Sequence, residues 1–177
     1  MPAWEIHNKW AEKIGISTDV SNYVNRMIDF PEQDPEFLRF CDDWDKEVLQ
    51  SKRRRNVVCI PITEVVGKHD VSRQRKTAAY IQLEFLRRKG KEYVRAWYLH
   101  HALDYIERAP LLTVEEVLER LEKRTQPDPE LEEVKRFVKD NSREILKNCR
   151  RCQSSYLHFF ASKVISQLIR KNGLAGI

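Results

Sequence analysis

Residues 90–110 read GKEYVRAWYLHHALDYIERAP, and this stretch decides the fold class. Its apolar residues recur three or four positions apart, which is the spacing of one face of an α-helix. They are Ala96, Leu99, Leu103 and Ile106. Gly90 precedes this pattern and Pro110 follows it, as is typical of helix boundaries. The stretch therefore predicts an amphipathic helix from about residue 91 to Pro110.

Helix boundaries of the same kind recur on both sides of this stretch. The residues that favour a helix start are Pro2, Ser17 to Asp19, Asp34-Pro35, Asp70, the capping box Thr113 to Glu116, Asp128-Pro129 and Asn141. The residues that favour a helix end are Gly15, Pro31, Gly90, Pro110 and Gly173. The sequence predicts an all-α fold, a single compact bundle of about seven or eight helices spanning residues 1–177.

Two segments interrupt the helical pattern. Residues 56–66, NVVCIPITEVV, are rich in β-branched side chains and contain Pro61, so they predict a short extended connector. Residues 125–129 combine a polar run with two prolines, and they are the predicted loop or hinge.

Composition limits the class of protein. The chain has 177 residues, of which 41% are hydrophobic and 33% charged, which suits one globular domain with a charged surface. Apolar runs are too short for a membrane span, and the N-terminus has no signal-peptide pattern. We therefore expect a cytoplasmic protein without a membrane partner, with reduced cysteines at positions 41, 59, 149 and 152.

Charge is concentrated in the middle of the chain. Residues 51–100 hold 13 Lys and Arg against 4 Asp and Glu, a net of +9, whereas residues 1–50 have a net of −6. A basic block of this kind favours phosphate, either on a small molecule or on nucleic acid.

Histidine and aspartate residues occur in a suggestive order. His7 is followed by the doublet His69-Asp70 and then by Asp104 on the helix quoted above. This order on a helical scaffold resembles the HD superfamily of metal-dependent phosphohydrolases. The resemblance covers four residues between positions 7 and 104. The doublet departs from the family pattern because it begins a helix instead of following an apolar helical run.

The resemblance implies a metal site and a phosphorylated substrate. It makes His7, His69, Asp70 and Asp104 ligands of a divalent metal ion that activates water for attack on phosphorus. His100, four residues before Asp104, and His101 would support the ligands, although His101 lies opposite the apolar stripe and is expected to be exposed. The substrate phosphate, on a nucleotide or another phosphorylated molecule, would be held by Lys68, Arg73, Arg75 or Lys76.

Other interpretations stay open. Asp70 is equally well explained as a helix N-cap, and Asp104 as a charge partner of a neighbouring histidine or of Arg108. If the chain is not an enzyme, one alternative is a helical module that binds nucleic acid through its basic segment. The other is a protein-interaction subunit whose oppositely charged regions pair between copies in a homo-oligomer. The nucleic-acid interpretation rests on two basic runs, Lys52, Arg53, Arg54 and Arg55, and Arg87, Arg88 and Lys89.

Overall fold

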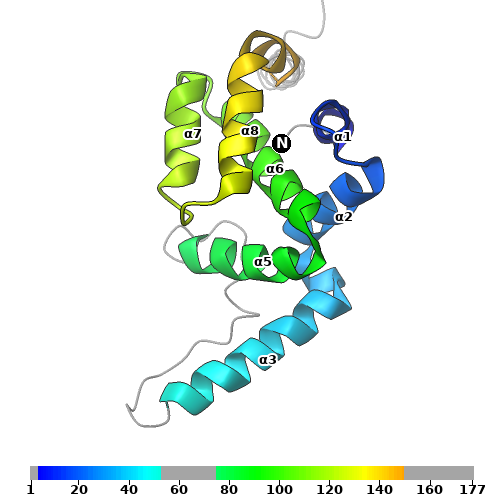
Figure 1. Cartoon of the computed structure of the whole chain (residues 1–177), viewed down its shortest axis with the longest axis vertical. Helices are drawn as coiled ribbons and strands as arrows, with labels where there is room; N and C mark the ends of the chain where they lie inside the picture. The colour runs from blue at the N-terminus through cyan, green and yellow to red at the C-terminus, as the bar shows by residue number, and fades with distance from the viewer. Residues whose placement is uncertain (1–3, 53–74, 150–177) are drawn as a thin grey trace, which may run out of the picture.

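The computed structural model describes residues 4–52 and 75–149 of the chain (Figure 1). These residues form helices joined by short loops, and no strand occurs in either described range. The predicted all-α fold is confirmed. The helices include α1 (Trp4–Lys13), α2 (Thr18–Asp29), the 3-10 helix η1 (Pro31–Gln33), α3 (Pro35–Lys52), α5 (Arg75–Lys89), α6 (Lys91–Arg108), α7 (Val114–Glu122) and α8 (Pro129–Asp140). Residues 142–149 are also helical.

Side-chain caps start several of these helices where the sequence predicts. Ser17 Oγ accepts a hydrogen bond from the Val20 amide at the start of α2. Asp34 Oδ1 accepts the amides of Glu36 and Phe37 at the start of α3. These oxygens satisfy amides that have no partner within the helix. At the end of α1, Gly15 takes φ +81, a conformation that glycine adopts without steric cost.

Helix α6 is the central element of the bundle. It contacts α1 and α2 on one side and α5, α7 and α8 on the other, and Figure 1 shows it crossing the middle of the molecule. Because neighbours surround it, α6 buries residues all round its axis, polar ones included. Three of the polar residues that it buries are His100, Asp104 and Glu107. The position of α6 thus places potential ligands inside the protein.

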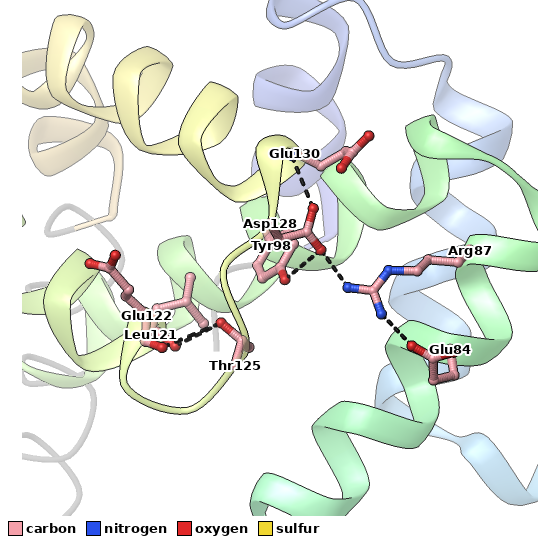
Figure 2. A network of polar contacts seen from close by, with 8 residues as sticks. All are labelled: Glu84, Arg87, Tyr98, Leu121, Glu122, Thr125, Asp128 and Glu130. Atoms are coloured by element: carbon pink, nitrogen blue, oxygen red, sulfur yellow. Dashed lines mark hydrogen bonds and ion pairs between the residues drawn. The ribbon is translucent and has the colours of Figure 1, made fainter.

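The loop between α7 and α8 is tied to the rest of the bundle by Asp128 (Figure 2). Its Oδ1 accepts the Glu130 amide at 3.0 Å and caps α8. Its Oδ2 accepts hydrogen bonds from the Tyr98 hydroxyl at 2.9 Å and from Arg87 at 2.6 Å. Thr125 donates its hydroxyl to carbonyl groups at the end of α7. One carboxylate therefore joins α5, α6 and α8.

Some sequence predictions fall outside the described residues. The extended connector at 56–66, the cap at Asp70 and most of the predicted C-terminal helix belong to them. The break predicted at Asn141 is confirmed, because α8 ends there and residues 142–149 are again helical. The proposed hinge at 125–129 stays a prediction. A search of the described residues finds no helix with the length and apolar character of a membrane span.

Candidate metal site

Three buried side chains with metal-binding atoms meet between α1 and α6. His7 of α1 is 2% exposed, and His100 and Asp104 of α6 are each 1% exposed. One potential ligand atom from each of the three lies within 4.8 Å of those from the other two. His7 reaches this place because α1 packs against both α2 and α6. His100 and Asp104 share a face of α6 because they are four residues apart.

The individual distances suit atoms that share one ion. His7 Nε2 lies 3.4 Å from Asp104 Oδ1, and His100 Nε2 lies 3.8 Å from Asp104 Oδ2. Two atoms bound to one ion at about 2.0–2.2 Å lie at most about 4.0–4.4 Å apart. Both measured distances fall below that limit, so these pairs can bind a common ion after small side-chain movements.

A chain of asparagine side chains orients His100. Asn8 donates to Asn22 Oδ1 at 2.7 Å, and Asn25 Nδ2 donates to Asn8 Oδ1 at 3.4 Å. The remaining atom, Asn25 Oδ1, lies 2.8 Å from His100 Nδ1. Because an amide oxygen only accepts, this arrangement assigns the hydrogen to Nδ1 of His100. Nε2 is then the nitrogen that faces the carboxylates and offers a lone pair when the ring is neutral.

Asp29, at the end of α2, completes the polar surroundings. Its Oδ2 accepts a hydrogen bond from Trp4 Nε1 at 2.8 Å, and its Oδ1 lies 3.9 Å from His100 Nε2. The Asp29 side chain is buried, like that of Asp104. Two carboxylates therefore face one imidazole in the protein interior, where a lone negative charge is costly.

The charge of Asp104 is stabilised by its neighbours. Burial raises the pKa of this carboxyl, but the contact with His7 and the charges of His7, His101 and Arg108 outweigh that effect. The result is a pKa below the usual range, which keeps Asp104 ionised near neutral pH. Arg108 Nη2 lies 3.4 Å from Asp104 Oδ2, and with its side chain 40% exposed it links the cluster to solvent.

The donor atoms fit a divalent cation. His7 Nδ1 and Nε2, Asp29 Oδ1 and Asp104 Oδ1 are buried, and none has a hydrogen-bond partner within the described part of the chain. Buried polar atoms are normally satisfied, so several such atoms in neighbouring side chains call for an explanation. Imidazole nitrogen with carboxylate oxygen is a donor set for zinc, iron, manganese or cobalt ions.

The predicted ligands therefore divide into two groups. His7 and Asp104 come together, whereas His69 and Asp70, with the phosphate-binding candidates Lys68 and Arg73, lie outside the described residues. Two further phosphate-binding candidates, Arg75 and Lys76, belong to the first turn of α5, but the positions of their side chains are not among those described.

The two supporting histidines differ from expectation in opposite ways. His100, predicted to stand behind the ligands, lies among them. His101 is half-buried, and its ring lies 4.1 Å from that of Trp97, so the expectation that it is exposed was wrong. The reason is that α6 has neighbours on nearly every side, which leaves no fully exposed face opposite its apolar stripe.

The second basic run is engaged with its own protein. Arg87 bonds Glu84 and Asp128, and Arg88 lies over the Phe40 ring. Lys89 pairs with Glu36 at 2.5 Å. Of the first run, Lys52 ends α3 without a described side chain, and residues 53–55 lie outside the described residues. A nucleic-acid surface therefore stays a prediction from charge.

Several residues of the site escaped sequence reasoning. Asn22, Asn25 and Asp29 are spaced three and four apart on α2, so the sequence places them along one side of that helix. Asn25 is buried beside the apolar residues Val24 and Ile28. Amide and carboxylate side chains along the apolar side of a predicted helix are the feature of the sequence that indicates a buried polar site here.

Comparisons with known proteins add no assignment. No protein-family model, curated protein or solved structure matches this chain.

Proposed function

We propose that this protein binds a divalent metal ion through His7, His100 and Asp104 and hydrolyses a phosphorylated small molecule, such as a nucleotide. The observation that carries the proposal is the meeting of three buried ligand-type side chains from two helices that lie about ninety residues apart in the chain. The order-based resemblance to metal-dependent phosphohydrolases provides the reaction class. The excess of buried carboxylate over buried cation adds an electrostatic reason for a bound cation.

Each residue has a distinct role in this proposal. A bound divalent ion supplies an activated water and polarises a phosphoryl oxygen. His100 presents Nε2 because Asn25 holds its Nδ1. Asp104 would supply an anionic oxygen to the ion, with the Arg108 guanidinium beside its other oxygen. Arg108, which is adjacent to Asp104 and partly exposed, is suited to hold a phosphate oxygen where the cluster reaches solvent.

The first test is metal binding by the purified full-length protein. The metal-free protein is titrated with Mn²⁺, Co²⁺ and Zn²⁺ by calorimetry, alongside the variants His7→Gln and Asp104→Asn. We expect one ion per chain in the wild type and an affinity weaker by about 100-fold or more in both variants, since even indirect partners of ligands contribute about 10–100-fold. Asp19→Asn, at an exposed carboxylate of α2, is the matched control and should bind as the wild type does.

Activity is measured separately. Release of phosphate from a panel of nucleoside mono-, di- and triphosphates, and of nitrophenol from p-nitrophenyl phosphate, is followed with each metal. Metal-dependent hydrolysis that is lost in Asp104→Asn supports the complete proposal. Tight stoichiometric binding without hydrolysis would leave a metal centre and refute the phosphohydrolase. No stoichiometric binding of any of the three ions would refute both parts.

A further inference from the structure

We infer that Asp29 is a fourth ligand of this metal site, so that three helices, α1, α2 and α6, hold one ion with two nitrogen and two oxygen donors. The inference rests on the proposed metal-binding function and deepens it. Asp29 belongs to α2, a third helix, whereas His7 lies on α1 and His100 and Asp104 lie on α6.

The first argument is geometric. Asp29 Oδ1 lies 3.9 Å from His100 Nε2, which is almost the same as the 3.8 Å between that nitrogen and Asp104 Oδ2. Both distances are below the limit of about 4.0–4.4 Å for two atoms bound to one ion. His100 Nε2 thus has a carboxylate oxygen of each of two helices within 3.9 Å. Among the described residues, only His7, His100 and Asp104 have ligand atoms that all lie within 4.8 Å of one another, so a shared ion would draw the Asp29 carboxylate closer to the other ligands.

The second argument is that Asp29 is held in place with one oxygen left over. Trp4 Nε1 donates to Oδ2 at 2.8 Å, and the Trp4 ring packs edge-on against Phe30 with 6.5 Å between ring centroids. Oδ1 is buried and has no hydrogen-bond partner among the residues that the structure describes. A carboxylate with one oxygen anchored by an indole and the other directed at the cluster has the arrangement of a ligand with a supporting partner.

The third argument is charge. Asp29 and Asp104 bring two negative charges, and Arg108, with its partly exposed side chain, brings one positive charge. With neutral imidazoles the cluster keeps an excess negative charge, which a divalent ion compensates. An ion that takes six ligands would keep two positions for water and a phosphoryl oxygen beside four protein donors. An ion that takes four ligands would have no position left for either.

The test compares two aspartates of the same helix. The metal-free full-length protein, as wild type, Asp29→Asn and Asp19→Asn, is titrated with Co²⁺ while the visible absorption of the bound ion is recorded. We expect Asp29→Asn to weaken Co²⁺ binding by about 100-fold or more and to alter the absorption spectrum, because an amide replaces a charged ligand. Asp19→Asn should match the wild type in affinity and spectrum.

The outcomes separate this inference from the proposed function. If the wild type binds one Co²⁺ and Asp29→Asn binds it with the same affinity and spectrum, Asp29 is not a ligand and the three-residue site stands. If the wild type binds no Co²⁺, the metal-binding function fails and the fourth ligand with it. Circular dichroism of each variant shows whether the helical fold is retained.

A second variant decides the matter if Asp29→Asn does not fold. Trp4→Phe keeps an aromatic ring beside Phe30 but removes the indole donor that holds Asp29 Oδ2. We expect Co²⁺ affinity to fall by about 10–100-fold, as is usual when the partner of a ligand is lost. A folded Trp4→Phe protein with wild-type affinity and spectrum would overturn the inference.

Discussion

Asp128 shows how one buried carboxylate can hold several elements together. Burial raises its pKa, but hydrogen bonds with Glu130, Arg87 and Tyr98 outweigh that effect and hold the pKa of Asp128 below its usual range. Burial, together with this carboxylate, raises the pKa of Tyr98, so that the phenol stays a donor. These contacts keep Asp128 ionised and Tyr98 protonated near neutral pH.

The lowered pKa of Asp128 gives stability a pH dependence with a definite sign. An aspartate whose pKa is lower in the folded state stabilises the protein above its unfolded pKa of about 3.9, and this contribution is lost as pH falls through the folded pKa. We therefore expect the free energy of unfolding to fall below about pH 4, measured by urea denaturation at a series of pH values. Asp128→Asn should be less stable at pH 7, and its free energy of unfolding should fall less steeply as the pH is lowered below about 4.

Glu130 must be controlled in this experiment because Asp128 raises its pKa, which produces the opposite pH trend. The comparison is therefore repeated in a Glu130→Gln background. Asp140→Asn, at the exposed end of α8, tests for a general effect of removing one charge. If the free energy of unfolding falls equally steeply with acid pH in the wild type and in Asp128→Asn, Asp128 does not contribute to the pH dependence of stability.

At the scale of single helices, α7 shows how local sequence specifies a structural element. The Thr113 hydroxyl accepts the Glu116 amide at 3.2 Å, while the Glu116 carboxylate accepts the Thr113 amide at 2.8 Å. The residues that α7 buries are Val114, Val117, Leu118 and Leu121. A reciprocal cap and an apolar stripe within nine residues therefore define both the start and the inner face of the helix.

The cap of α7 should contribute measurably to stability. We expect Thr113→Ala to lower the free energy of unfolding by about 1 kcal/mol, because the Glu116 amide loses its acceptor. Thr113→Ser keeps the hydroxyl and should stay within a few tenths of a kcal/mol of the wild type. Urea denaturation at neutral pH measures both variants. Equal losses in the two would assign the effect to the methyl group and not to the cap.

At the scale of the whole molecule, the proposed metal ion would join the N-terminal helices to α6. Helix α1 is also tied to residues beyond α8 by Lys9 and Lys13, which both pair with Glu144 on the surface. Those exposed pairs contribute little to stability, whereas an ion bound only by the folded state stabilises it in proportion to its affinity. If the ion binds as proposed, it would be the stronger of the two connections.

Metal binding should therefore raise the thermal stability of the entire chain. At a free metal concentration of about 100 times Kd, the folded state gains about 2.7 kcal/mol, which corresponds to several degrees in Tm for a protein of this size. We expect this rise in calorimetric melting of the wild type and Asp19→Asn, but not of Asp104→Asn. An equal rise in Asp104→Asn would indicate binding elsewhere on the protein.

The sequence by itself determined the helices and most of their boundaries. A cap such as Ser17, Asp34, Thr113 or Asp128 acts within three residues of its own position, so the information for a helix start is local. Helical spacing likewise identified the inner stripe of α6. The same spacing led to the wrong exposure for His101, because a periodic pattern records one apolar face and not how many neighbours surround the helix.

Only the tertiary structure decided which polar residues meet. The order of residues in the chain favoured His69 and Asp70 as companions of Asp104, and their place lies outside the described residues. Within the described residues, the packing of α1 and α2 against α6 brings His7 and His100 to Asp104, and Asp29 to His100. The physical reason is that a helix fixes the relations of residues three or four positions apart, whereas contacts between helices depend on how their buried faces fit together.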